Sequence, residues 1–256
     1  FHQAGQASRK HGRKPAFQRR RRHAGRRDWL ETAGCPQAAG VVPPLFPLSV
    51  NTSISWNFPW QDELEKFPDP AGLHGRLETY LGMLLDWNAR VNLISRRETD
   101  PEIHFVDSLH FASALPPDAT VADIGTGAGF PGMVTALARP DVRVTLVEPI
   151  LKKQAFLQAL IAHFHLDTVT LRRARLENGV LRDVQTSRVF HETWGHVVCK
   201  ALTSPENFRK MAGNCAGTLW FLASADQACE APPAWREHHR WVVAAGRVRV
   251  LLQLPL

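Results

Sequence analysis

The sequence predicts an α/β fold: a small helical segment followed by a mostly parallel, doubly wound sheet of seven strands. Three observations support this. Short apolar β runs alternate with helical stretches after Pro117. The first of these runs enters a glycine-rich loop that leads into a helix, as in sheets that bind nucleotides. The chain has 256 residues and is 44% hydrophobic, which is enough for a core of this size.

The net charge of +7 comes from the beginning of the chain. Residues 1–50 hold ten of the 31 Lys and Arg residues and two of the 24 acidic residues, which gives +8. The other 206 residues hold 21 basic and 22 acidic residues, which gives −1. We therefore expect residues 1–60 to form a disordered, Arg-rich leader, either an RNA-binding arm or a dispensable extension.

Residues 61–116 are expected to form a small helical N-terminal domain. Leu73, Leu77 and Leu81 recur at helical spacing. Asp100-Pro101-Glu102 resembles a helix start with Pro in the first turn, and Pro116-Pro117 ends the segment. Residues 117–256 then form the second domain.

The seven strands are expected in this second domain. The apolar runs lie at residues 121–124, 142–147, 169–171, 196–200, 218–223, 241–244 and 248–254, with helices at 131–138 and 152–163. The last two runs flank Ala245-Gly246-Arg247 and predict an antiparallel closing hairpin.

The loop after the first strand carries the main chemical signal. Gly125, Gly127 and Gly129 let the backbone turn sharply and approach a ligand closely. Phe130 stands where a dinucleotide-binding loop needs its third glycine, and no Gly-Lys-Ser/Thr phosphate loop occurs. Asp123 precedes the first glycine by two residues. Its carboxylate can hold the ammonium group of an amino-acid moiety, directly or through water.

A second carboxylate lies at the end of the second strand. Glu148 follows Gly125 by 23 residues, the approximate spacing at which an acidic residue accepts hydrogen bonds from ribose hydroxyls. The alternative is that Glu148 only caps the helix that begins near Ile150.

The composition also indicates the cellular compartment in which we expect the protein. The four cysteines form no CxxC pair and no zinc spacing, and free thiols fit a reducing compartment. No apolar run approaches the ~20 residues of a membrane span, and the Arg-rich start lacks the apolar stretch of a secretory signal. We expect a cytoplasmic monomer with no metal and no membrane partner.

Several ordered segments carry a resemblance to a known family. Residues 73–250 resemble the bacterial small-subunit ribosomal RNA guanine-N7 methyltransferases (RsmG, formerly GidB). The segments are WNARVNLIS (87–95), HFVDSL (104–109), DIGTGAGFPG (123–132), Arg139-Pro140, KKQAFL (152–157) and RLE (175–177).

The resemblance implies a class I methyltransferase fold, a Rossmann-like sheet, with S-adenosyl-L-methionine as the methyl donor. It also implies methylation of N7 of a guanine in the decoding-region hairpin of 16S rRNA, with the 30S subunit or its precursor as partner. The donor-binding residues it implies are Asp123, Gly125, Thr126, Gly127, Gly129, Phe130, Glu148, Leu176 and Glu177.

On the acceptor side we expect no catalytic acid–base pair. Guanine N7 carries a lone pair and no proton, so the enzyme mainly has to hold N7 in line with the methyl group. Lys200, His104 and Asp107 are candidates for this positioning, and Arg139, Arg175 and Lys200 for RNA contacts. The alternatives are a structural contact for His104 and Asp107, which lie one helical turn apart, and ordinary surface positions for the three cations.

The chain departs from the family at three places. Ile103 replaces an arginine, Lys200-Ala201 replaces Arg-Ala, and Ala223-Ser224 replaces a lysine-glycine pair. Arginine and lysine are not equivalent at a phosphate or guanine site. Two alternatives therefore stay open: a class I methyltransferase with another substrate, and a non-catalytic RNA-binding relative.

Overall fold

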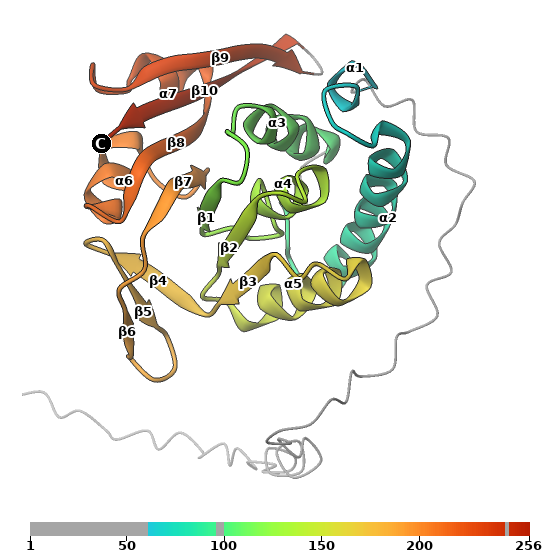
Figure 1. The fold of residues 1–256 in the computed structure, drawn as a ribbon, viewed down its shortest axis with the longest axis horizontal. Helices are drawn as coiled ribbons and strands as arrows, with labels where there is room; N and C mark the ends of the chain where they lie inside the picture. Colours follow the sequence, from blue (N-terminus) through green and yellow to red (C-terminus); the bar gives the residue numbers. More distant parts are fainter. Residues whose placement is uncertain (1–60, 96–99, 244–245) are drawn as a thin grey trace, which may run out of the picture. The chain divides into compact units, whose positions relative to one another are not determined.

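The computed structural model describes residues 61–95, 100–243 and 246–256 (Figure 1). The predicted leader, residues 1–60, lies outside the described residues. A seven-stranded sheet forms the centre of the described part. In spatial order its strands are β3 (Val169–Arg172), β2 (Arg143–Val147), β1 (Thr120–Ile124), β7 (Trp194–Lys200), β8 (Ala216–Ser224), β10 (Arg247–Pro255) and β9 (Arg236–Val243).

The strand directions confirm the predicted fold class. Strands β3, β2, β1, β7 and β8 are parallel, while β10 runs antiparallel to both β8 and β9. The β9–β10 pair is the predicted closing hairpin. Among the described residues, no helix combines the length and the apolar character that a membrane span needs.

Helices cover both faces of the sheet. The first face packs on α3 (Glu102–Ser113), α4 (Gly132–Ala138) and α5 (Leu151–Phe164). Helices α1 (Gln61–Leu64) and α2 (Pro70–Asn88) pack in turn on these helices. The second face packs on α6 (Pro205–Ala212) and α7 (Ala225–Cys229). The connecting helices therefore change sides between β1 and β7. In open α/β sheets, ligands bind at this switch point, outside the carboxyl ends of the strands.

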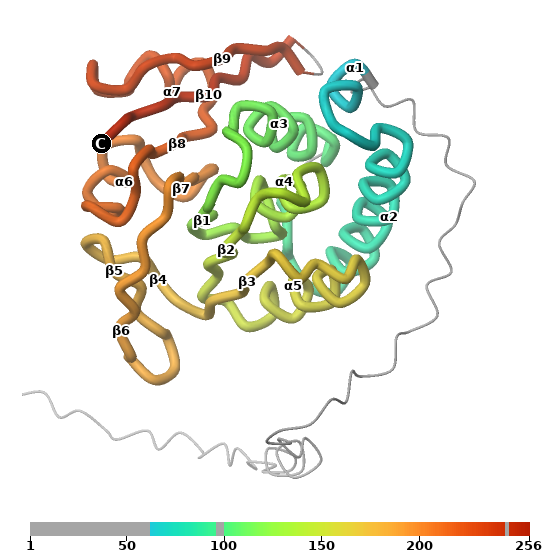
Figure 2. The backbone as a smooth tube through the Cα atoms, in the orientation of Figure 1, coloured from blue at the N-terminus to red at the C-terminus, as the bar shows by residue number. Residues whose placement is uncertain are grey.

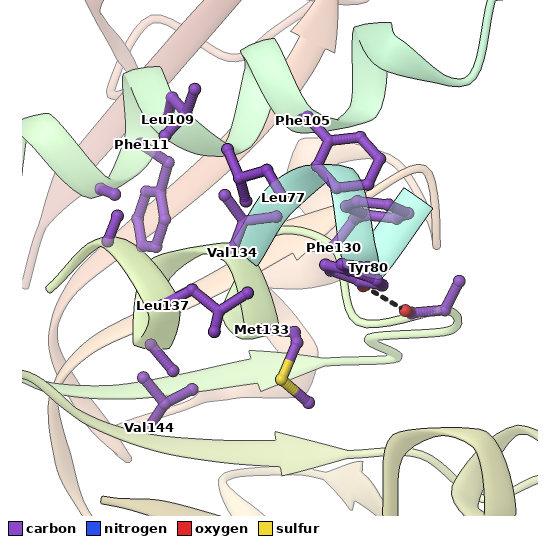
Figure 3. Close-up of a cluster of buried hydrophobic side chains, with 14 of the residues drawn as sticks. Leu77, Tyr80, Phe105, Leu109, Phe111, Phe130, Met133, Val134, Leu137 and Val144 are labelled. Atoms are coloured by element: carbon purple, nitrogen blue, oxygen red, sulfur yellow. Dashed lines mark hydrogen bonds between the residues drawn. The ribbon is translucent and has the colours of Figure 1, made fainter. Parts of the chain in front are cut away.

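One aromatic cluster joins α2 and α3 to the loop after β1 (Figure 3). Tyr80, the single tyrosine of the chain, is fully buried on α2. Its hydroxyl donates to the Ala128 carbonyl at 2.5 Å, and its ring stacks on Phe130 at 5.5 Å. Phe105 on α3 meets the same Phe130 ring edge-on at 5.0 Å. The helices before residue 116 thus share a core with the sheet, and their independence as a domain stays a prediction.

A small second sheet was not predicted. It consists of β4 (Ala174–Glu177), β5 (Val180–Asp183) and β6 (Val189–Phe190), and the chain passes through it between β3 and β7 (Figure 2). Leu176 and Leu181 bury against the second face of the main sheet, while the alternate residues Arg175, Glu177 and Arg182 stay exposed. Strands with one or two buried residues give too little alternation to be detected in a sequence.

The predicted start of the hairpin at Trp241 was wrong. Strand β9 begins at Arg236, five residues earlier. Residues 236–240 are all exposed because β9 is the edge strand of the sheet. An edge strand with charged side chains carries no apolar pattern, and such charges are a common means of protecting sheet edges.

We predict that Tyr80→Phe lowers the free energy of unfolding by about 1–3 kcal/mol, because it leaves the buried Ala128 carbonyl without its donor. Urea denaturation measures this change. The control is Thr79→Ala on the same helix, since the Thr79 hydroxyl bonds the Gly75 carbonyl on the exposed side. Equal losses in the two variants would contradict a special role for the Tyr80 hydroxyl.

Candidate functional site

The candidate site lies at the carboxyl ends of β1 and β7, at the switch point. The loop after β1 is held by backbone bonds: the amides of Gly125 and Thr126 donate to the Val147 carbonyl at 2.9 and 3.2 Å. Gly129 and Phe130 both donate to the Thr126 carbonyl. The loop therefore joins the ends of β1 and β2 and turns directly into α4.

The physical reason for a glycine differs from one position of this loop to the next. All three have positive φ, at 68° for Gly125, 61° for Gly127 and 105° for Gly129. A Cβ at Gly129 would lie 2.5 Å from the Tyr80 hydroxyl, so packing excludes a side chain there. A Cβ at Gly127 would meet nothing closer than 3.8 Å. Gly127 thus leaves an open stretch of backbone that a ligand can approach.

Asp123 is buried beneath the loop. Its Oδ2 accepts from the Thr126 hydroxyl at 2.5 Å and from the Gly132 amide at 2.8 Å. Its Oδ1 is buried and has no hydrogen-bond partner within the described ranges. Burial raises the pKa of Asp123 to about 6, against the opposing effect of these two donors. A buried oxygen without a donor costs free energy that a ligand donor can recover.

Glu148 caps α5 and also holds the glycine loop. Its Oε1 accepts from the Ile150 amide at 2.8 Å, and its Oε2 accepts from the Gly127 amide at 3.0 Å. The capping contact weighed in the sequence is therefore present. Since a carboxylate has about four lone-pair sites, two remain for another donor, and the ribose contact stays a prediction.

Two of the residues predicted to bind the methyl donor lie on β4. Leu176 is buried in the second core, and Glu177 is exposed with its carboxylate 3.0 Å from Arg182. The side-chain contacts of Glu177 thus tie it to β5. Arg175, a predicted RNA contact, is exposed on the same strand directly opposite Arg182.

The structure places Arg139 away from the other candidates. It follows α4, near the amino end of β1, and its guanidinium donates to the carbonyls of Ala112, Leu115 and Pro116 at 2.9–3.1 Å. It also forms a two-point bond with Asp141, which lowers the pKa of that carboxyl to about 2. Arg139 therefore anchors the segment between α3 and β1.

Asp107 is the centre of a buried charged cluster that includes the other positioning candidates. Its side chain is fully buried on α3. It accepts from Lys200 of β7 at 3.0 Å, from Arg249 of β10 at 2.9–3.2 Å and from the Trp241 indole of β9 at 3.2 Å. One carboxylate thus joins a helix to three strands. Lys200 is only 7% exposed, so it is not a solvated surface lysine.

Electrostatics fixes the charge states in this cluster. Burial acts to raise the pKa of Asp107, but Lys200 and Arg249 outweigh it, and the pKa is lowered. Burial lowers the pKa of Lys200, with Asp107 opposing. The Lys200 ammonium also lies 2.9 Å from Nδ1 of His104. Burial, followed by the charge of Lys200, lowers the pKa of His104 to about 3, so its imidazole is neutral.

Sequence reasoning missed three residues of this site: Tyr80, Trp241 and Arg249. The sequence offers a weak signal for Arg249 only, because it is a charged residue inside the apolar run 248–252. Tyr80 and Trp241 lie within apolar patterns that indicate only a core.

Comparisons with known proteins identify a family that this chain resembles. Residues 74–227 match the family described as rRNA small subunit methyltransferase G (GidB). Curated relatives of that name are 40% identical over 121 residues in Wolinella succinogenes, 42% over 106 residues in Desulfotalea psychrophila and 50% over 88 residues in a Nocardioides species.

These matches cover 46%, 40% and 33% of this chain. They span 63%, 49% and 35% of the three relatives, less than two thirds of each.

We predict that Asp107→Asn destabilises the fold by about 3–5 kcal/mol, because it leaves the buried Lys200 ammonium and the partly buried Arg249 guanidinium without their counter-charge. Thermal and urea unfolding measure this loss. The folded pKa of Asp107 is lowered, so its contribution is complete above about pH 4 and is lost only below that. The deficit should therefore be constant from pH 5 to 8. Glu237→Gln, at an exposed pair with Arg240, is the control; an equal loss there would contradict the prediction.

Proposed function

This chain belongs to the rRNA small subunit methyltransferase G family, and from that premise we propose that it methylates N7 of a guanine in 16S rRNA. S-adenosyl-L-methionine is the proposed donor. Two observations carry the proposal: the buried Oδ1 of Asp123 has no hydrogen-bond partner among the described residues, and the backbone at Gly127 in the same loop region is open. The proposed acceptor is a guanine of the decoding-region hairpin, in the 30S subunit or its precursor, and the enzyme acts as a cytoplasmic monomer.

The residues at the loop fit the donor. When bound, S-adenosyl-L-methionine supplies a methyl group on an electrophilic sulfonium. Asp123 Oδ1 would accept from its ammonium group, and the backbone around Gly127 would lie against its amino-acid part. The two free lone-pair sites of Glu148 would accept from the ribose hydroxyls. The backbone of Leu176 and Glu177 would line the adenine.

The remaining loop residues shape this pocket. Thr126 and Gly125 connect the loop to β2 through the Val147 carbonyl, and Thr126 fixes the other oxygen of Asp123. Gly129 and Phe130 pack the loop against Tyr80. These contacts hold in place the loop atoms that would face S-adenosyl-L-methionine. They contribute no charge of their own.

The charged cluster positions groups and does not transfer protons. Guanine N7 needs no base, and Asp107 is ionised, buried and bonded to Lys200, Arg249 and Trp241. Of the two arginines expected at the RNA, Arg175 suits phosphate contact because it is exposed. Arg139 has its donors engaged by carbonyls and Asp141.

Methylation of 30S subunits tests this proposal. Subunits from cells that lack N7-methylguanosine in 16S rRNA are incubated with labelled donor, and the modified nucleotide is mapped by mass spectrometry. We expect one N7-methylguanosine in the wild-type reaction and none with Gly127→Arg, which fills the open backbone. Donor binding without transfer to 30S subunits or to naked 16S rRNA would overturn the rRNA assignment. Absence of S-adenosyl-L-methionine binding would overturn the assignment of this chain as a methyltransferase.

The pKa of Asp123 gives a pH dependence for donor binding. A carboxyl whose pKa is raised to about 6 is protonated below that pH and then no longer attracts an ammonium group. We predict that the Kd for S-adenosylhomocysteine, which keeps this group, is constant above about pH 7 and rises toward tenfold per pH unit below 6. Calorimetry measures it. Asp123→Asn should bind weakly and without this dependence; the same pH slope in the variant would exclude Asp123 as its source.

A further inference from the structure

We propose that His104 recognises the target guanine, its Nε2–H donating a hydrogen bond to O6, the atom beside the methylated N7. This inference rests on the proposed function and names a specificity residue for it. Lys200 acts through His104 as the residue that fixes its hydrogen-bonding state.

The tautomer of His104 follows from its partner. A lysine ammonium has three donors and no acceptor, so Nδ1 of His104, 2.9 Å from Lys200, must be the acceptor. In a neutral imidazole the other nitrogen then carries the proton. Asp107, 3.0 Å from the same ammonium, keeps Lys200 charged and in place. The ion pair therefore fixes His104 as a donor at Nε2.

His104 lies beside the glycine loop after β1. Its ring packs on Phe130 at 5.1 Å between centroids, and the Lys200 ammonium lies 5.6 Å from the same ring. Nε2 has no hydrogen-bond partner in the part of the chain that the structure describes, and it is not among the enclosed atoms there. An N–H group that is not fully enclosed thus stands next to the loop, at the carboxyl end of the sheet.

A donor at this place selects guanine. The edge of guanine that carries N7 presents O6, an acceptor, whereas adenine presents an amino donor at the same place. An N–H group at O6 therefore favours guanine and meets another donor on adenine. It also orients the base so that N7 stays free.

The neutral state of His104 suits the charge change of the reaction. Methyl transfer forms the N7–CH3 bond as the sulfonium–CH3 bond breaks, and the positive charge passes to the guanine with no proton moved. A cationic donor at O6 would oppose this charge, while a neutral imidazole does not. The Lys200 ammonium is paired with the Asp107 carboxylate at 3.0 Å.

A variant-and-substrate cycle tests the proposal. The 30S subunits are rebuilt with 16S rRNA that carries either guanine or 2-aminopurine, which lacks O6, at the methylated position. For His104→Phe we expect kcat/KM on guanine to fall about tenfold and on 2-aminopurine to stay within twofold of wild type. Comparing variant with wild type on each base cancels the intrinsic reactivity of N7.

The control is His110→Phe, the same substitution on the same helix at a ring that packs on Trp241. His110→Phe should change kcat/KM by the same factor on guanine and on 2-aminopurine. Calorimetry with S-adenosylhomocysteine, expected to be unchanged in His104→Phe, verifies the fold and the donor site. Equal losses on both bases in His104→Phe would overturn the recognition role. A wild type that binds donor but methylates neither base would instead overturn the proposed function.

Discussion

The site depends on the interactions of one buried carboxylate, that of Asp107. It is bonded to Lys200, Arg249 and Trp241, and so joins α3 to β7, β10 and β9. Without this partner, the buried Lys200 ammonium and the partly buried Arg249 guanidinium would be strongly unfavourable. The pairing therefore fixes how α3 lies on the sheet, and with it the place of His104 beside the loop. The helices before the sheet are in this way a part of the site.

The loop after β1 depends on a second, apolar constraint. Tyr80 and Phe105 reach it from α2 and α3, and both pack on Phe130. Gly129 is needed for this packing, whereas Gly127 leaves backbone open to a ligand. The same helices thus support the donor side of the site by packing and the acceptor side by charge. A change in their position would alter both sides together.

Much of this could be predicted from the sequence, for local reasons. The strands of the main sheet follow from apolar runs, except for the first five residues of β9, and the glycine loop with Asp123 and Glu148 follows from spacing along a short segment. The charged cluster could not be predicted, because Asp107 and Arg249 are 142 residues apart and only the sheet order brings them together. The burial of Lys200 and the sheet of β4–β6 were missed for a related reason, since tertiary packing decides both.

The state of His104 tests the central claim most directly, because it depends on the whole cluster. Nitrogen-15 NMR of the histidine side chains distinguishes the two neutral tautomers and the imidazolium. We expect His104 to remain neutral, with the proton on Nε2, from pH 8 to pH 5. A wild-type His104 that titrates near its ordinary pKa of ~6.5, or that carries the proton on Nδ1, would contradict the account.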